Sequence, residues 1–167
     1  AVLERQGTSQ ALLESLERAN LFTIPLDDQR TWYRYHHLFA DLLQTRLYQR
    51  VDASGLTALR LQASQWHAEH GLLPAAVELA FQASDFERAA ALIEQSAEEM
   101  LRRGELVTFK RWIERLPAAQ ITARPTLCLY QAWALLWSGS PFDLIAASLQ
   151  PLKDVDLHTA RMLPLQA

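Results

Sequence analysis

Apolar residues follow two different spacings over the first fifty positions. Across residues 9–19 and again across residues 36–50 they recur at helical spacing, which predicts two amphipathic helices. Between them, residues 21–35 form two short apolar and aromatic runs on either side of the polar turn Asp27-Asp28-Gln29. That pattern is typical of a β-hairpin, in which Pro25 favours an edge position because proline has no N–H to donate. The region is therefore predicted to fold as helix, hairpin, helix.

Beyond Gly55 the apolar spacing is helical throughout, and single glycines interrupt it. Gly71, Gly104 and Gly139 each end a predicted helix, and they lie 33 and 35 residues apart. Each of them separates the two helices of a pair, and this period is typical of helical hairpin repeats of the tetratricopeptide (TPR) kind. We therefore expect a mainly α protein in which an α-superhelix of about three helix pairs follows the hairpin. An irregular helical bundle is the alternative.

Turn and capping residues predict where the helices begin. Residues 52–55 contain Asp, Ser and Gly and predict a boundary, so the next helix is expected from Thr57. Ser84 and Glu87 have the spacing of a capping box, which predicts Ser84 as the N-cap of a long helix.

Composition supports a helical globular protein and excludes several other classes. Half of the residues are apolar, while five glycines and seven prolines are too few for a collagen-like or Gly-rich chain. The net charge is −3, and no segment of the chain is strongly basic. A protein that binds nucleic acid on its own would need such a segment. The single cysteine excludes an intramolecular disulfide, and no apolar run approaches the ~20 residues of a membrane span. We expect a cytoplasmic protein without membrane contact and, since no Met begins the sequence, a fragment of a longer chain.

Few residues form a pattern that carries chemistry. No phosphate loop, nucleophile elbow or dinucleotide fingerprint is present. His67 and His70 are one helical turn apart, but the sequence shows no third ligand that would complete a metal site with them. Cys128 lies on an apolar helix face, where we expect it to pack in the core. We therefore expect no catalytic residue, no metal site and no enzyme activity in this chain. Trp112 and Trp137 are expected to be either core residues or exposed ligand anchors.

The remaining cluster lies where the second strand leads into a helix. His36 and His37 stand at this corner, beside the free backbone N–H groups of a helix N-terminus. A histidine in that place can donate a hydrogen bond to a phosphate group. The alternative is that His36 caps the helix or stacks in the corner without a ligand.

The sequence around this cluster, residues 22–43, resembles the end of the winged-helix domain in the large ATP-binding regulators of the LuxR family. These are signal-transducing ATPases similar to the maltose-regulon activator. Segments between residues 63 and 136 resemble the first helical repeats of the same family. The resemblance covers residues 9–150.

The resemblance implies a domain order of nucleotide-binding domain, winged helix, helical-repeat sensor and DNA-binding helix-turn-helix. Residues 1–52 would then be the C-terminal part of the winged-helix domain, and residues 53–167 a truncated TPR-like sensor domain. It also implies that the fragment holds no cofactor itself, that the full-length protein binds ATP and ADP, and that His36 contacts the phosphates of this nucleotide.

The implied function is that of the central segment of an ATP-dependent LuxR-type transcriptional regulator, which couples nucleotide state to sensing by the helical repeats. The implied partners are the protein's own nucleotide-binding and DNA-binding domains, an unidentified small-molecule or protein inducer, and a second copy on self-association. DNA would be bound only by the absent C-terminal domain. ADP would favour a closed form, and ATP with inducer an open form that self-associates. A free-standing TPR-like adaptor for protein partners is the alternative.

Overall fold

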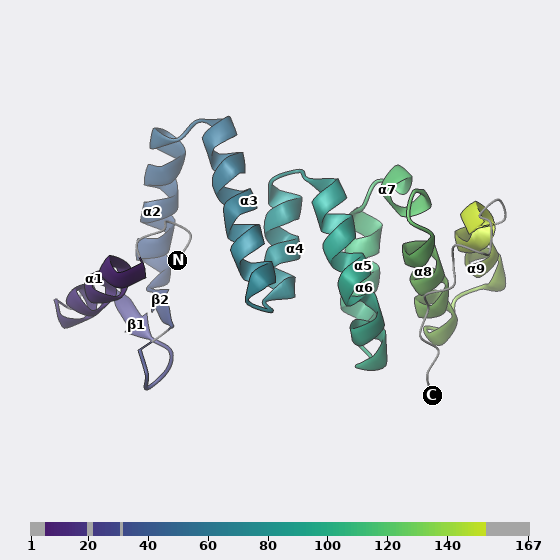
Figure 1. The fold of residues 1–167 in the computed structure, drawn as a ribbon, viewed down its shortest axis with the longest axis horizontal. Coiled ribbons are helices and arrows are strands. Elements are labelled where there is room, and N and C mark those ends of the chain that lie inside the picture. The colour runs from purple at the N-terminus through teal and green to yellow at the C-terminus, as the bar shows by residue number, and fades with distance from the viewer. Residues whose placement is uncertain (1–5, 20–21, 31, 153–167) are drawn as a thin grey trace.

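The chain folds as a row of helices with one small sheet near its start (Figure 1). The computed structural model describes residues 6–19, 22–30 and 32–152. The elements in these ranges are α1 (Gln6–Arg18), β1 (Thr23–Pro25), β2 (Tyr33–Tyr35), α2 (His37–Arg50), α3 (Ala53–Glu69), α4 (Leu73–Gln82), α5 (Phe86–Arg102), α6 (Leu106–Arg115), α7 (Ala118–Thr122), α8 (Pro125–Trp137), α9 (Phe142–Leu149) and a short 3-10 helix (Gln150–Leu152). The expected mainly α class, with one hairpin and packed helix pairs, is confirmed. No helix within the described ranges has both the length and the apolar character needed to cross a membrane.

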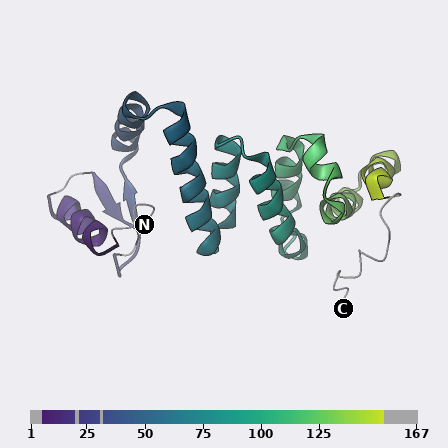
Figure 2. The same cartoon turned by 45° about the horizontal axis from the view of Figure 1, so that its top comes forward.

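The hairpin near the start is antiparallel, with Ile24 of β1 opposite Arg34 of β2. In its turn, the Leu26 N–H donates to the Trp32 carbonyl at 2.8 Å, and the Trp32 N–H donates to the Asp27 carboxylate at 2.8 Å. Asp27 is a turn residue because its side chain supplies an acceptor that the backbone does not. α1 packs against β1 of the hairpin, and Figure 2 shows the two at one end of the row.

The prediction that the first repeat helix begins at Thr57 is wrong, because α3 begins at Ala53. Asp52 is its N-cap, and the Asp52 carboxylate accepts a hydrogen bond from the Gly55 N–H at 2.8 Å. This hydrogen bond satisfies an amide that the first turn of a helix leaves free. The break between α2 and α3 thus lies at Val51 and Asp52, and residues 53–55 form the first turn of α3. The hydrogen bond from the Gly55 N–H is also the main reason that the pKa of Asp52 lies below its usual value.

Gly71, Gly104 and Gly139 end their helices as predicted, in the left-handed conformation with φ between 67° and 75°. At Gly104 the N–H donates to the Leu101 carbonyl at 3.0 Å, and the following N–H, of Glu105, donates to the Met100 carbonyl at 2.9 Å. These two hydrogen bonds define a Schellman turn, in which the left-handed residue is usually glycine.

The assignment of Ser84 as an N-cap is wrong, because Ser84 closes the helix before it. Its φ is 58°, its N–H donates to the Phe81 carbonyl, and the Asp85 N–H donates to the Ala80 carbonyl, both at 3.0 Å. This is again a Schellman turn, now with serine at the left-handed position. The N-cap of α5 is Asp85, whose carboxylate accepts from the Arg88 N–H at 2.9 Å.

Replacing Ser84 with glycine is expected to stabilise the protein by about 0.5–1 kcal/mol. A left-handed residue that carries a Cβ costs roughly 1–2 kcal/mol, and the greater freedom of glycine in the unfolded chain cancels part of the gain. Ser84 is exposed, so no buried packing is lost. Urea unfolding followed by circular dichroism measures the change. Ser84→Ala is the control, since it keeps the Cβ and should leave the stability nearly unchanged; equal effects of the two substitutions would contradict the argument.

The helices after the hairpin pack as three pairs, α3 with α4, α5 with α6, and α8 with α9. α5 also packs against α4 and α8 of the neighbouring pairs and therefore lies at the centre of the row. Of the described side chains, none that precedes Ser64 is buried, so the core belongs to the helix pairs. The core residues are Ala76, Val77, Ala80, Phe81, Ala89, Ala90, Leu92, Ile93, Ala97, Met100, Leu101, Phe109, Trp112, Ile113, Leu116, Leu127, Tyr130 and Ala134.

Arginines at the junctions between pairs bind carboxylates of the pair before them. Arg115 of α6 donates to both carboxylate oxygens of Glu78 in α4, at 2.7 and 2.8 Å, and lies 4.0 Å from the centre of the Phe81 ring. Arg124, just before α8, donates to Glu94 of α5 at 3.0 Å. The hydrogen bonds from Arg115 are the main reason that the pKa of Glu78 lies below its usual value. These contacts fix the register between neighbouring pairs.

Candidate functional site

The backbone of His36 joins the hairpin to α2. Its N–H donates to the Phe22 carbonyl at 2.7 Å, which extends the strand pairing by one residue. Its own carbonyl accepts hydrogen bonds from the N–H groups of Phe39 and Ala40, both at 2.9 Å, so that His36 is also the N-cap of α2. No side-chain hydrogen bond caps this helix. The backbone hydrogen bonds of His36 therefore place its ring in the corner between sheet and helix.

The imidazole of His36 is half-buried among other rings. Its centre lies 4.3 Å from that of His37 and 6.4 Å from that of Phe22, and Phe22 in turn stacks on Phe39 at 5.4 Å. The Nδ1 atom of His36 is enclosed by protein, with no hydrogen-bond partner in the described part of the chain. A buried polar atom without a partner is rare in native proteins and often marks a missing ligand, water or neighbouring domain.

The surface around this corner is apolar. None of the described side chains of α1, β1, β2 and α2 is buried, although α2 carries apolar residues on several of its turns. Large apolar side chains of this region that are exposed are Leu12, Phe22, Ile24, Leu26, Trp32, Tyr35, Leu38, Leu42, Leu43, Leu47 and Tyr48. Large apolar side chains exposed in this number mark a place where another part of a protein packs.

His67 and His70 belong to an aromatic cluster where the hairpin meets α3. Trp66 stacks on His70 with the ring centres 4.0 Å apart, and Trp32 of the hairpin meets Trp66 edge-on at 6.3 Å. The His70 Nδ1 lies 2.7 Å from the Trp66 carbonyl, while the His67 Nδ1 is enclosed without a partner among the described residues. In the described ranges, no group of three or more His, Cys, Asp or Glu side chains has the arrangement of a metal site.

Cys128, Trp112 and Trp137 take different positions in the helix pairs. The Cys128 thiol is buried and donates to the Ile121 carbonyl at 3.2 Å, and burial raises its pKa, which disfavours the reactive thiolate. Trp112 is a core residue, 2% exposed, whereas Trp137 is 54% exposed. The sequence left open whether each tryptophan is a core residue or exposed. In the structure Trp112 is in the core, and Trp137 is on the surface.

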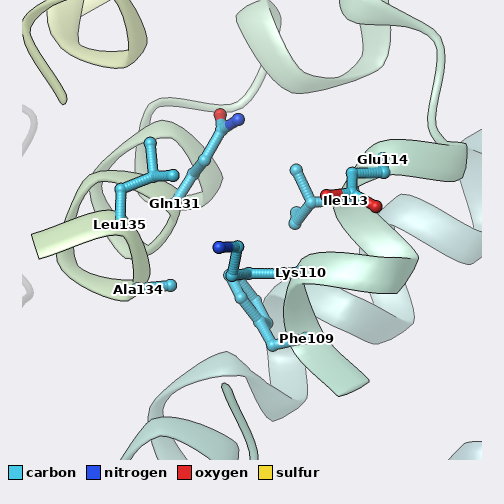
Figure 3. A pocket seen from close by; sticks show the side chains of 7 residues that line it. All are labelled: Phe109, Lys110, Ile113, Glu114, Gln131, Ala134 and Leu135. Atoms are coloured by element: carbon cyan, nitrogen blue, oxygen red, sulfur yellow. The ribbon is translucent and has the colours of Figure 1, made fainter. Parts of the chain in front are cut away.

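Two hollows lie next to α8, and Gln131 and Leu135 of this helix line both of them. The smaller one lies between α6 and α8, with a volume of about 50 Å³ (Figure 3). Phe109, Lys110, Ile113 and Glu114 of α6 face Gln131, Ala134 and Leu135 of α8 across it. The larger hollow, of about 360 Å³, lies between α7, α8 and α9 and includes Cys128, Gln131, Leu135, Leu144 and Ser148 in its lining. Sequence analysis did not find these hollows, because their walls come from residues that are distant along the chain.

Comparison with known proteins places the first part of the chain in a described family. Residues 1–55 match the MalT winged helix domain. This range contains α1, the hairpin, the His36 corner and α2.

Longer relatives match most of the chain. It is 35% identical over 125 residues to the serine/threonine-protein kinase PknK of Mycobacterium tuberculosis, which covers 75% of this chain and 11% of that protein. It is 34% identical over 123 residues to the HTH-type transcriptional regulator MalT of Vibrio cholerae (74% of this chain, 14% of the relative), and 30% identical over 157 residues to MalT of Klebsiella pneumoniae (93% and 17%). No solved structure matches the chain.

The resemblance to MalT-like regulators inferred from residues 22–43 is thus confirmed. The chain has a MalT winged-helix region at its N-terminus and is distantly homologous to MalT regulators and to PknK over most of its length. It spans between 11% and 17% of the length of the relatives named above.

Proposed function

We propose that this chain is the central segment of a cytoplasmic, ATP-dependent MalT-like transcriptional regulator, and that it couples the nucleotide state of the whole protein to sensing by its helix pairs. The observation that supports this most directly is the match of residues 1–55 to the MalT winged helix domain, with His36 at the corner between its hairpin and its last helix. In this proposal the chain performs no chemistry itself. It transmits a conformational change between a nucleotide-binding domain and a DNA-binding domain.

The proposed division of labour follows the domains expected from the sequence. Residues 1–52 are the C-terminal part of a winged-helix domain, and residues 53–167 are the beginning of a TPR-like sensor. The exposed apolar side chains of α2 and the hairpin support the first assignment, since a complete winged helix would bury such side chains under its other helices. The sequence of packed helix pairs supports the second, because stacked pairs provide an extended surface for an inducer.

His36 is the residue that we propose as the link to the nucleotide. Its imidazole is only half-buried, so part of the ring faces the surface, and it stands at the N-terminus of α2, where backbone N–H groups and the helix dipole favour an anion. In the closed form, the nucleotide-binding domain would pack on this corner, and the imidazole would donate to a phosphate of bound ADP. Loss of that contact would favour the open form that binds ATP, inducer and a second copy.

Replacing His36 with alanine in the full-length regulator is expected to weaken ADP retention by roughly tenfold or more. A hydrogen bond to a charged phosphate contributes about 1.5–3 kcal/mol, and its loss destabilises the ADP-bound form selectively. The measurement is the amount of ADP that remains bound after gel filtration, together with the basal activation of a reporter promoter. His37→Ala is the matched control, because His37 is the exposed neighbour on the same corner. Unchanged retention and unchanged basal activation in His36→Ala would remove His36 from the site.

One comparison favours a second candidate function, as a segment of a protein kinase. The chain is as similar to PknK, a serine/threonine-protein kinase by name, as it is to MalT regulators. The same sensing segment would then serve a protein kinase instead of a DNA-binding regulator. Sequencing the whole reading frame separates the two contexts, since a helix-turn-helix supports the regulator and a protein-kinase signature supports the kinase.

A further inference from the structure

The first helix of each pair, α3, α5 and α8, turns one side to solvent. Positions six and two residues before the glycine of each pair lie on this side, which we call the first-helix face. They are occupied by Gln65 and Glu69, by Glu98 and Arg102, and by Trp133 and Trp137. Trp133 is half-buried, and the other five are exposed. Glu98 and Arg102 stay exposed although α8 packs on α5, so exposure at these positions does not depend on whether another pair follows.

Aromatic rings occupy the first-helix face on α8. Tyr130, Trp133 and Trp137 lie at helical spacing, and the ring centre of Trp133 is 6.4 Å from that of Tyr130 and 5.9 Å from that of Trp137. Trp137 is 54% exposed. The same positions on α3 and α5 carry polar or charged side chains, so the third pair adds an aromatic stripe to the face. Exposed tryptophan is among the residues that most often carry the binding energy of an interface.

Tyr130 places a hydroxyl beside the carboxylates of α5. Burial raises the pKa of Tyr130, and the negative charges of Glu98 and Glu94 raise it further, so both carboxylates lie near this hydroxyl. The side chain is buried, with 8% exposed, yet within the described ranges its hydroxyl makes no hydrogen bond. A buried polar group without a partner often marks the place of a missing ligand.

Glu98 carries a negative charge to which no cation is bound in the described part of the chain. Its neighbours on α5 differ, because Glu94, one turn before it, is bound by Arg124 at 3.0 Å. Arg102, one turn after it, is bound to Glu99. A carboxylate, a neutral hydroxyl and indole rings side by side match a cationic group. The carboxylate supplies the opposite charge, the hydroxyl oxygen accepts a hydrogen bond, and the face of a ring attracts the cation.

Amide side chains continue the first-helix face onto the first and second pairs. Gln62 and Gln95 are exposed at the position that Tyr130 takes in the third pair. Gln65 is also exposed, and its amide donates to Glu69 at 2.6 Å. An amide side chain has both a donor and an acceptor, as has each unit of a peptide backbone. The face thus offers contacts over three pairs, more than one small amine can reach, and it matches an extended segment.

We propose that the first-helix face binds an extended peptide segment of a partner protein that carries a lysine or an arginine. The cationic group lies between the Glu98 carboxylate and the Tyr130 hydroxyl, and a neighbouring apolar side chain of the segment packs on Trp137. Such a segment would be the inducer that the helix pairs sense, so the inference rests on the proposed function in this respect. The binding itself requires neither a nucleotide nor DNA.

Selection from a library of random octapeptides displayed on phage tests this chemistry, with the chain immobilised as the target. The selected peptides are expected to share a lysine or arginine next to an apolar residue. A synthetic peptide of the shared sequence, labelled with fluorescein, then gives the dissociation constant by fluorescence anisotropy.

Glu98→Gln and Trp137→Ala are each expected to raise the dissociation constant of this peptide by roughly tenfold. Both side chains are exposed, so neither substitution should unfold the chain. Glu114→Gln is the matched control for charge, because Glu114 is also an exposed glutamate but lies on α6, outside the first-helix face. It should leave the dissociation constant unchanged.

A double-mutant cycle across the contact identifies the group that Glu98 binds. Replacing the basic residue of the peptide with norleucine is expected to weaken binding to the wild-type chain roughly tenfold, and binding to Glu98→Gln much less. Equal weakening in both would show that the basic residue lies elsewhere and would overturn the proposal. So would a selection that yields no peptides or only peptides without a basic residue, or an unchanged dissociation constant in Glu98→Gln. Because the chain is tested without nucleotide, such a failure leaves the expected effect of His36→Ala on ADP retention intact.

Discussion

Replacing Trp112 with alanine is expected to lower the free energy of unfolding by about 3–5 kcal/mol. The Trp112 ring is 2% exposed in the core, and its Nε1–H donates to Glu78 of α4 at 3.2 Å. The substitution would leave a large cavity where the first and second helix pairs meet, and it would also remove a hydrogen bond between these pairs. Urea unfolding followed by circular dichroism measures the loss as a shift of the midpoint.

Trp137→Ala is the matched control for this experiment. Trp137 has the same side chain in the third pair but is 54% exposed, so its removal should cost less than about 1 kcal/mol. Both variants are compared with the wild-type chain at the same protein concentration. Similar losses for the two tryptophans would contradict the placement of Trp112 in the core.

Replacing Ser64 with alanine is expected to cost about 1.5–3 kcal/mol, a large effect for the loss of one oxygen atom. The Ser64 hydroxyl is fully buried, donates to the Ala76 carbonyl of α4 at 2.8 Å and accepts from the Arg88 Nε of α5 at 2.9 Å. One hydroxyl thus connects α3, α4 and α5, and its removal leaves a charged guanidinium without this acceptor. The change in free energy is measured by urea unfolding.

Ser96→Ala gives the matched comparison. Ser96 is also buried, but its hydroxyl donates to the Leu92 and Ile93 carbonyls of its own helix, at 3.0 and 3.1 Å. Such local bonds add little to stability, so we expect a loss of less than about 1 kcal/mol. A double-mutant cycle of Ser64→Ala with Arg88→Met isolates the contribution of the contact between the two side chains. A coupling energy near zero would show that the contact does not stabilise the fold.

Features that depend on neighbouring residues were predicted well from the sequence. The hairpin follows from two short apolar runs around Asp27, and Gly71, Gly104 and Gly139 end their helices because glycine adopts the left-handed conformation without strain. The prediction for Ser84 was wrong because serine rarely adopts the left-handed conformation, so its sequence gives no sign that it ends a helix.

Features that depend on distant residues could not be predicted in this way. The two hollows beside α8 and the network around Ser64 bring together side chains from different helices, and no local pattern specifies them. At the candidate site, the corner position of His36 was predicted from the change from strand-like to helical spacing of the apolar residues. The enclosure of its Nδ1 depends on three-dimensional packing and gives no signal in the sequence. The role of His36 toward a nucleotide stays a prediction.

The central position of α5 has a consequence for how the molecule opens. In a linear array of helix pairs, stability is close to a sum of each pair's own stability and its interfaces with neighbours. α5 has interfaces with α4, α6, α7 and α8, whereas α9 packs on α8 and on the short helix that follows it. Local unfolding therefore begins at the ends of the row and proceeds inward, so that amide protons of α5 exchange with solvent last. The centre of the row is then its most persistent structure, and the two ends are the parts that rearrange at the lowest free-energy cost.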